Sequence, residues 1–498
     1  MTYQPQFLDT VAEGVFFLDH RLLPEVRAMF CAMSSRMPAG GIEARYMQIV
    51  DAVAEGLIAD TMEFGGREGG EFPVNDTARK RAEERLCVAP LHPKVQEFFD
   101  QFVLRYGHSS IMELTGSPSV YVQGVSYWAA MKSFGNPQVA GQEFSTRAVR
   151  HKNWPMAREC FISVEENHTF TTETTQSLVP HPVLKSLHDG WFEIFEAEVE
   201  AWKNHLTDPE NRAALGIKDK EPFRPALDRA RSCIPGTIST GFAHTANLRT
   251  MARVIQDGQK LAKASGAPAV LKVWEDIAKG YAAALPGLAE MGLREAVYTS
   301  PSDLDMHLGV FGAYQEDASN DVAVKLHLLG KNILPMVRCR KFGEKTYLDP
   351  WFNQFARVDI AFQCSLAVAR DWHRHRTMMP WYLEIVWDGD LLQLHHKYEL
   401  KSDYGRSNYE RMLRESTEAY RAFMKAGDEY RAMLCLPLGT KVQMSGQAGL
   451  RDVVYMLELR AFSHGASFEY SAQAKEAIRQ LVGLLGSDVC GKIGLKAP

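Results

Sequence analysis

The chain has 498 residues, of which 46% are hydrophobic and 23% charged, the composition of an ordinary globular protein. Its formal net charge of −5 argues against a general nucleic-acid binder or membrane-surface binder. The N-terminus lacks the pattern of a signal peptide, and no stretch approaches the roughly 18 apolar residues of a membrane helix. Eight scattered cysteines, with no Cys-x-x-Cys pair, indicate reduced thiols, so we expect a cytoplasmic protein of more than one domain.

In chain order, the first clear pattern is residues 119–137, which predict a strand that runs into a helix. Ser126 is placed to cap this helix, because its hydroxyl can accept a hydrogen bond from the first turn. The turn residues at 135–137 would end it. Residues 182–206 then predict a long amphipathic helix, and the polar stretch 207–228, which contains prolines, predicts a loop insertion.

The second half of the chain shows similar patterns. Residues 356–376 predict another strand that runs into a helix, because apolar side chains alternate at the start of this stretch. Ser365 is placed to cap that helix. Residues 407–434 predict a pair of amphipathic helices broken at Gly427.

Two short segments of the chain closely resemble each other. Residues 233–249 (CIPGTISTGFAHTANLR) and 435–451 (CLPLGTKVQMSGQAGLR) share a cysteine, a proline, a turn of small residues and a closing Leu-Arg. Their first residues are 202 positions apart and so are their last, so the block repeats without a gap. Together with the two strand-helix patterns, this predicts a duplication, with an N-terminal copy at 1–295 and a C-terminal copy at 296–498.

Four motifs are divided between the two halves. The C-terminal half has Arg374-His375-Arg376 and LRAFSH at 459–464, whereas the N-terminal half has GHSSIME at 107–113 and QEFSTR at 142–147. Together they resemble the signature of the flavin-dependent thymidylate synthases: Arg-His-Arg-x-x-Ser-x-Asn-Glu-x-Ser-x-Arg, an upstream Gly-His-x-(Ser/Thr)-x-x-Glu and a downstream Leu-Arg-x-x-Ser-His. Each half has lost what the other keeps, as shown by Gly135-Asn136-Pro137 in the first and by Met379, Trp381, Glu384 and Val386 in the second.

The resemblance implies a fold, an activity and partners. The fold would be α+β, with two fused copies of a twisted sheet and flanking helices forming a pseudo-dimer, and two chains pairing as a homodimer. The activity would be flavin-dependent transfer of a methyl or hydroxymethyl group to C5 of a pyrimidine nucleotide similar to dUMP. FAD would be the cofactor, and methylenetetrahydrofolate and NADPH the co-substrates. The alternatives are a flavoprotein of the same fold with another redox role in nucleotide or natural-product metabolism, and a non-catalytic binding or scaffold protein.

The resemblance assigns the catalytic role to Arg460. An arginine placed against O2 and N3 of uracil would stabilise the negative charge that develops when C5 acts as a nucleophile. The alternative is a surface arginine on an amphipathic helix. For substrate binding, the resemblance implies Arg374, Glu143, Ser145 and Arg147. Ser145 and Arg147 would lie on one side of an extended segment and suit a phosphate, with Glu143 meeting the sugar or the flavin.

The Arg374-His375-Arg376 block is the candidate flavin site. Guanidinium groups match a diphosphate and a negatively charged reduced flavin ring, and few acidic residues stand near the block. At helical spacing the three side chains would point in different directions around the ligand. The alternative is that they only complement a helix dipole. By resemblance, the other flavin and folate contacts would be His108, Ser110, Glu113, Asn247, Arg249 and His464.

Three departures from the family pattern bear on the substrate. Gln142 replaces an asparagine, and Gln443 stands where the family places a substrate-binding arginine, with Gly241 at the corresponding point of the first half. A modified pyrimidine nucleotide, or transfer that stops at the hydroxymethyl stage, would therefore fit as well as methylation of dUMP. We expect no metal site, because His373 and His375 lie on different faces of a helix.

Overall fold

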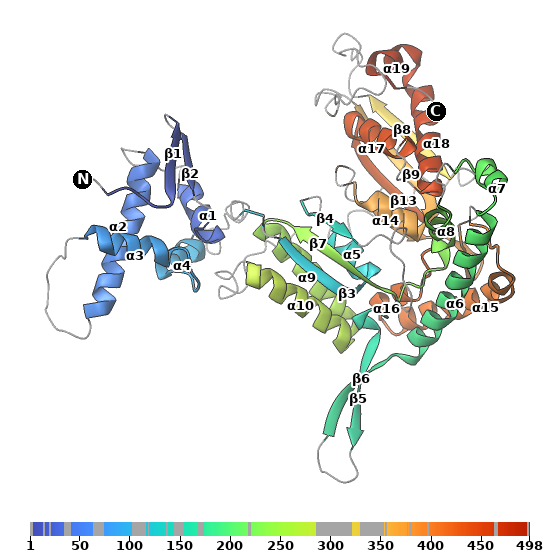
Figure 1. Cartoon of the computed structure of the whole chain (residues 1–498), viewed down its shortest axis with the longest axis horizontal. Coiled ribbons are helices and arrows are strands. Elements are labelled where there is room, and N and C mark those ends of the chain that lie inside the picture. The colour runs from blue at the N-terminus through green and yellow to red at the C-terminus, as the bar shows by residue number, and fades with distance from the viewer. Residues whose placement is uncertain are drawn as a thin grey trace. The chain divides into compact units, whose positions relative to one another are not determined.

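The protein is described here from a computed structural model of the chain (Figure 1). The structure describes residues 3–12, 15–18, 21–33, 41–62, 74–101, 116–117, 119–135, 138–143, 154–167, 174–217, 221–284, 321–328, 353, 356–375, 377, 381–395, 398–462, 467–495 and 498. The chain divides into two compact units. The first is Met1–Tyr121, Ala243–Asp257 and Glu275–Asp303, and the second is Val122–Phe242, Gly258–Trp274 and Leu304–Pro498.

The N-terminal part of the first unit joins a small hairpin to four helices. The hairpin is β1 (Leu8–Ala12) with β2 (Val15–Leu18), and the helices are α1 (Pro24–Met33), α2 (Gly41–Met62), α3 (Asp76–Arg85) and α4 (Pro93–Phe99). Buried Glu83 joins α3 to α2 and to the segment before β1, because it accepts hydrogen bonds from the Tyr46 hydroxyl at 2.9 Å and from the Tyr3 hydroxyl at 2.5 Å. Phe30 of α1 stacks on the ring of Tyr46 of α2.

A three-stranded sheet has the order β3-β7-β4, with β3 at Ser119–Ser126, β7 at Ser239–Thr245 and β4 at Ala140–Glu143. Helix α5 (Tyr127–Ser133) follows β3, and helices α9 (Leu248–Ser265) and α10 (Pro268–Ala284) follow β7.

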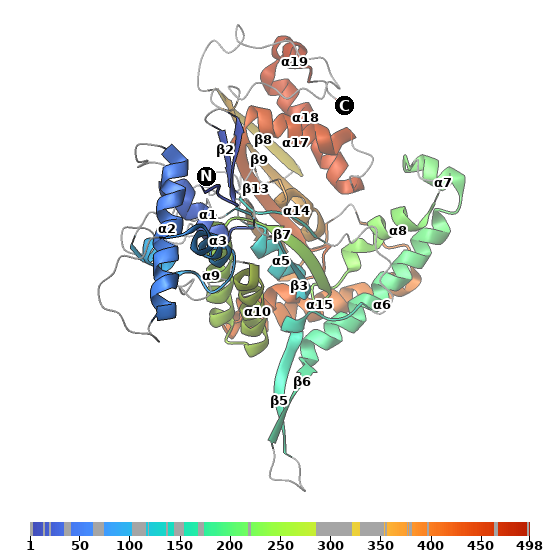
Figure 2. The same cartoon turned by 60° about the vertical axis from the view of Figure 1, so that its left-hand side comes forward.

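A four-stranded antiparallel sheet in the second unit has the order β10-β13-β9-β8. Its strands are β8 (Val322–Leu328), β9 (Ala356–Ser365), β10 (Tyr382–Ile385) and β13 (Lys441–Gly449). Helices α17 (Leu450–Phe462) and α18 (Phe468–Leu485) pack against it, and α19 (Ser487–Ile493) follows (Figure 2). Helix α14 (Leu366–His373) leaves β9, and its Trp372 stacks on Phe362 of that strand with ring centroids 4.3 Å apart.

The remaining elements of the second unit centre on two long helices that pack together, α6 (Pro182–His205) and α15 (Asp403–Lys425). The hairpin of β5 (Phe161–Asn167) and β6 (Thr174–Pro180) leads into α6 and projects beyond it in both views (Figures 1 and 2). The short elements are η4 (Arg158–Cys160), α7 (Pro209–Ala214), α8 (Phe223–Ala230), η5 (Arg231–Cys233), β11 (Trp387–Asp388), β12 (Leu391–Leu392) and α16 (Glu429–Leu434). No helix among the described residues is long and apolar enough to cross a membrane.

Several predictions of local structure are confirmed. The hydroxyl of Ser126 accepts from Ala129 N at 3.1 Å, and that of Ser365 accepts from Val368 N at 3.2 Å, so both serines cap their helices. The predicted helix pair is broken at Gly427, whose φ of 78° favours glycine. The predicted loop at 207–228 is wrong, because it contains α7 and most of α8, each of which begins beside a proline that suits a first helical turn.

Selected elements of the chain from β3 on, apart from the β5–β6 hairpin and several short elements, form two series with the same order. The first series is β3, α5, β4, α6, α8, β7, α9 and α10, and the second is β9, α14, β10, α15, α16, β13, α17 and α18. The sheets match as well, because β7 lies between β3 and β4 just as β13 lies between β9 and β10. The fold class is therefore α+β. The segment around the predicted boundary at 295 lies outside the described residues.

The two series interlock within the second unit. At the repeated loops, Leu438 N donates to Ile234 O at 2.9 Å and Gly439 N donates to Ser232 O at 2.8 Å. Gly236 must be a glycine here, because a Cβ atom would lie 2.4 Å from Leu436 O. The long helices are also joined, since the Trp191 indole N–H of α6 donates to a serine hydroxyl of α15 at 2.8 Å.

Candidate functional site

The candidate site is built at the last turn of α14. Ser365, which caps the helix, donates from its backbone N–H and its hydroxyl to buried Glu469, at 2.7 Å each. This double contact fixes where the helix begins. The helix ends at His373, and Arg374 is its C-cap residue, so the expectation that Arg374-His375-Arg376 continues with helical spacing is wrong. Polar groups therefore gather at the C-terminal end of α14.

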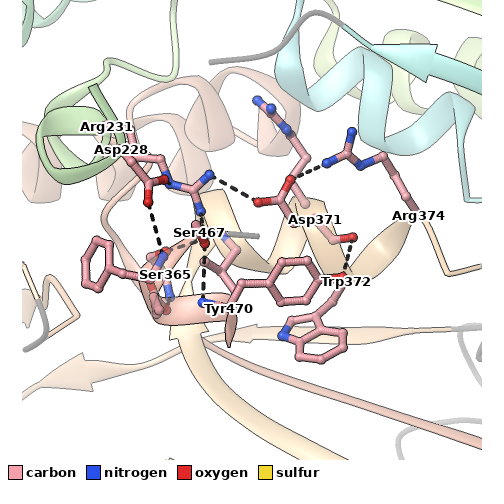
Figure 3. Close-up of polar contacts among 12 residues, drawn as sticks. Asp228, Arg231, Ser365, Asp371, Trp372, Arg374, Ser467 and Tyr470 are labelled. Atoms are coloured by element: carbon pink, nitrogen blue, oxygen red, sulfur yellow. Dashed lines mark hydrogen bonds and ion pairs between the residues drawn. The ribbon is translucent and has the colours of Figure 1, made fainter. Parts of the chain in front are cut away.

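Arg374 forms an ion pair with Asp371 (Figure 3). The Asp371 side chain is 2% exposed and that of Arg374 is 29% exposed. Residues three apart on a helix lie on the same side, so Asp371 faces Arg374 across one turn. The expectation that the block has no acidic partner is therefore wrong for Arg374.

A second arginine reaches the same carboxylate. Arg231 of η5 is fully buried and donates from Nη1 to Asp371 Oδ2 at 3.1 Å (Figure 3). Burial by itself would lower the pKa of the Arg231 guanidinium, but the nearby Tyr398 hydroxyl and the carboxylates of Asp371 and Asp228 reverse this and raise it. Asp371 thus lies between two guanidinium groups.

The third arginine of the cluster forms an ion pair across the two halves of the chain. Arg370 Nε lies 3.3 Å from Glu143 Oε2, with side chains 3% and 1% exposed. The Arg370 guanidinium also covers the ring of Tyr127, 4.4 Å from its centroid. Burial raises the pKa of Glu143, and the charges of Arg370 and Arg374 oppose that rise. Glu143 Oε1 is buried and has no hydrogen-bond partner among the described residues.

Arg460 lies on the other side of the block. Its Nε donates to His375 Nε2 at 3.0 Å, and its guanidinium lies over the Tyr470 ring at 5.2 Å. Burial, together with the charges of Arg460 and Arg374, lowers the pKa of His375 to about 3. The imidazole is therefore neutral and can accept the hydrogen bond from Arg460. The described contacts of Arg460 are with an imidazole and an aromatic ring, so no carboxylate neutralises its charge there.

The structure brings together four of the predicted site residues. Arg374, His375 and Arg460 form one network at the end of α14, linked through Asp371 and the Tyr470 hydroxyl. Glu143 lies near enough for the charges of Arg370 and Arg374 to affect its pKa. Among the described residues, the cluster combines four guanidinium groups with three carboxylates, those of Glu143, Asp228 and Asp371, and this excess of positive charge favours binding of an anionic ligand.

The other predicted residues divide into two groups. Asn247 and Arg249 belong to the other compact unit, where the Asn247 side chain caps α9 by accepting from Thr250 N at 3.0 Å and Arg249 is exposed. The cap is a sufficient local reason for the asparagine. The following predicted residues lie outside the described residues: His108, Ser110, Glu113, Ser145, Arg147, Arg376 and His464.

Sequence reasoning missed several residues of the cluster. Asp371 could have been found, because it stands three residues before Arg374 and a pair at that spacing is expected on a helix. Arg370, Arg231 and Tyr470 could not, because their contacts join segments that are distant in the chain. No local pattern marks such pairings.

Comparisons with known proteins give limited information. No protein-family model matches the chain, and no curated protein matches it. Among solved structures, the UMP/dUMP methylase PolB from Streptomyces cacaoi, bound with 5-Br dUMP, is similar at 18% sequence identity and a TM-score of 0.21. The match covers 29% of this chain and 74% of that chain. A likeness of this size carries no argument about function.

Proposed function

We propose that the protein transfers a methyl or hydroxymethyl group from methylenetetrahydrofolate to C5 of a pyrimidine nucleotide in a reaction that depends on FAD and NADPH. The observation that carries this proposal is the buried pair between Arg370 and Glu143. Glu143 belongs to the QEFSTR motif of the first half, and Arg370 precedes the Arg374-His375-Arg376 block of the second. Motifs that resemble two parts of one signature therefore meet at one place.

The described residues fit a flavin nucleotide in charge and in donor type. Arg374 Nε and Glu143 Oε1 are both buried and have no hydrogen-bond partner among the described residues. One is a cationic donor suited to a phosphate or to the electron-rich side of a flavin ring, and the other is an acceptor suited to a sugar hydroxyl. When bound, FAD would supply the redox chemistry of the carbon transfer.

The residues of this chain would have distinct roles. Arg460 would stabilise negative charge that develops on the pyrimidine ring, because its own charge is not neutralised by a described carboxylate. His375 would orient it, since a neutral imidazole accepts the Arg460 N–H without repelling the guanidinium. Ser145 and Arg147 remain the proposed phosphate contacts, and Arg376 remains a proposed flavin contact.

The proposal includes an architecture. The two series of elements would be fused copies, 1–295 and 296–498, that form a pseudo-dimer, and two chains would pair as a homodimer. The interlocked loops around Gly236 and Leu438 support the pseudo-dimer, because each loop hydrogen-bonds or closely approaches the backbone of the other. Two copies that face each other in this way can each supply half of a site.

The test is release of tritium from C5 of labelled nucleotides. Purified protein would be incubated with FAD, methylenetetrahydrofolate and NADPH, and with C5-tritiated dUMP, UMP or dCMP in turn. We expect release from at least one nucleotide, and release that is about 10²–10³-fold slower from an Arg460→Met variant. A protein that binds FAD but releases no tritium would have another redox role, and one that binds neither FAD nor nucleotide would overturn the proposal.

A further inference from the structure

Arg231 is fully engaged by protein groups and cannot itself contact a ligand. It is completely buried, and its Nη1 and Nη2 donate to Asp371 Oδ2 at 3.1 Å and to Ser467 Oγ at 3.4 Å (Figure 3). Its Nε donates to Tyr398 Oη at 3.3 Å. Its Nε also lies 3.7 Å from Asp228 Oδ1, so Arg231 pairs with two carboxylates. A guanidinium with an acceptor for each nitrogen is held in a single orientation. Its place beside the site therefore requires an explanation other than ligand binding.

The Asp371 carboxylate links Arg231 to Arg374. One of its oxygens accepts from Arg231 and the other from Arg374. Because the carboxylate is buried, its attraction for each guanidinium is strong. If Arg231 were absent, the carboxylate would lose one of its cationic partners and would hold the Arg374 guanidinium more tightly, in competition with any anionic ligand.

Arg231 also contacts the residue at the start of α18. Ser467, which accepts from its Nη2, caps α18 by accepting from Tyr470 N at 3.3 Å. The Tyr470 hydroxyl lies 2.7 Å from His375 Nε2 and donates to Asp371 O at 3.2 Å. Arg231 of the first half thus contacts Asp371 of α14 and the residue that caps α18, both in the second half.

We propose that Arg231 is a positioning residue for Arg374: it neutralises Asp371 and so leaves the Arg374 guanidinium available to the phosphate of a nucleotide. The identity of the nucleotide rests on the proposed function, but the coupling between the two arginines does not. The two side chains act on each other through Asp371, which predicts that the effect of changing one depends on the other.

The first test needs no ligand. The destabilisation caused by Arg374→Gln would be measured by urea unfolding in the native chain, in an Arg231→Met background and in an Arg229→Met background. Arg229 is the matched control, because it lies two residues away and its guanidinium covers the Phe468 ring at 3.8 Å. We expect Arg374→Gln to lower the folding equilibrium constant at least fivefold more in the Arg231→Met background than in the native chain. In the Arg229→Met background, Arg374→Gln should lower it by the same factor as in the native chain. Equal effects in all three would overturn the proposal.

The second test measures binding of dUMP and FAD by calorimetry. We expect Arg231→Met to weaken binding at least tenfold, Arg229→Met to leave it unchanged, and Asp371→Asn added to Arg231→Met to recover most of the loss. Unchanged binding in Arg231→Met would overturn the proposal. If the native protein bound neither probe, the proposed function would fail while the unfolding test still decided the coupling. If Arg231→Met did not fold, Arg231→Gln, which removes the positive charge but keeps a polar side chain, would replace it in both tests.

Discussion

Helices α5 and α14 begin in the same way and end differently. Ser126 and Ser365 cap them, and each serine donates from its backbone N–H and its hydroxyl to a buried glutamate, Glu159 for the first and Glu469 for the second. The two glutamates come from different kinds of element, η4 and α18. The same buried contact has thus been built twice from different parts of the chain.

The last turns carry different side chains. Counted from the capping serine, Met131 of α5 corresponds to Arg370 of α14, Lys132 to Asp371, and Gly135 to Arg374, as the sequence rows show. The buried start of each helix fixes the scaffold, whereas the charge of the site depends on a few positions in the last turn. Two helices that begin with the same buried contact can therefore carry different charges in their last turns.

The largest expected effect comes from breaking the Arg370–Glu143 pair. Arg370→Met should lower the free energy of unfolding by about 3–5 kcal/mol, because it leaves a buried carboxylate without its partner. Met131→Leu at the corresponding position of α5 should cost under about 1.5 kcal/mol, since it exchanges apolar side chains of similar volume. Urea unfolding measures both. An equal loss of unfolding free energy in the two variants would mean that the Arg370–Glu143 pair does not stabilise the last turn of α14.

Arg460→Met should reduce turnover about 10²–10³-fold while the flavin content of the protein stays the same. The reason is that Arg460 would act on charge that develops during the reaction, so kcat and kcat/KM should fall together. Arg479→Met is a suitable control, because Arg479 is an exposed arginine of α18 that pairs with Glu476. A rise in KM with kcat unchanged would instead assign Arg460 to ground-state binding.

Ser126→Ala and Ser365→Ala should destabilise the protein to a similar extent. Each removes a helix cap and one of the hydrogen bonds to a buried glutamate, which together cost about 2–3 kcal/mol. The two free energies of unfolding can be compared directly in urea. If the two substitutions changed the free energy of unfolding by amounts that differ by more than about 1 kcal/mol, the two caps would not contribute equally to stability.

Stability should fall as the pH falls below about 6.5. Burial and neighbouring cations lower the pKa of His375 to about 3, whereas the unfolded chain regains the ordinary value of about 6.5. The unfolded state then binds more protons than the folded state between these values, so the contribution is complete above pH 6.5 and is lost as the pH falls. The free energy of unfolding, measured in urea, should fall between pH 8 and pH 5 by about 1–2 kcal/mol less in His375→Gln than in the native chain. An identical pH dependence in the variant would contradict this assignment.

Much of the local structure could be predicted from the sequence because its causes are local. The serine caps at positions 126 and 365 and the break at Gly427 depend on a residue and its near neighbours, and all three are confirmed. The loop predicted at 207–228 failed because prolines were taken as helix breakers, whereas a proline in the first turn favours a helix.

The site could be predicted only in part. The motifs indicated Glu143, Arg374 and Arg460, but not what would hold them. Arg231 stands just after the predicted loop at 207–228 and belongs to none of the motifs, and its role depends on burial beside Asp371, 140 positions along the chain. Such contacts arise from tertiary packing, which a residue pattern does not encode locally.

The most direct test of the central claim is the number of flavins bound by one chain. Protein saturated with FAD and freed of excess ligand would be denatured, and the released flavin counted by absorbance against the protein concentration. The account predicts one FAD per chain, because in the described structure the arginines gather at the last turn of α14 and the last turn of α5 has none at the corresponding positions. Two FAD per chain would show that α5 also supports a site, and none would show that the arginine cluster serves another ligand.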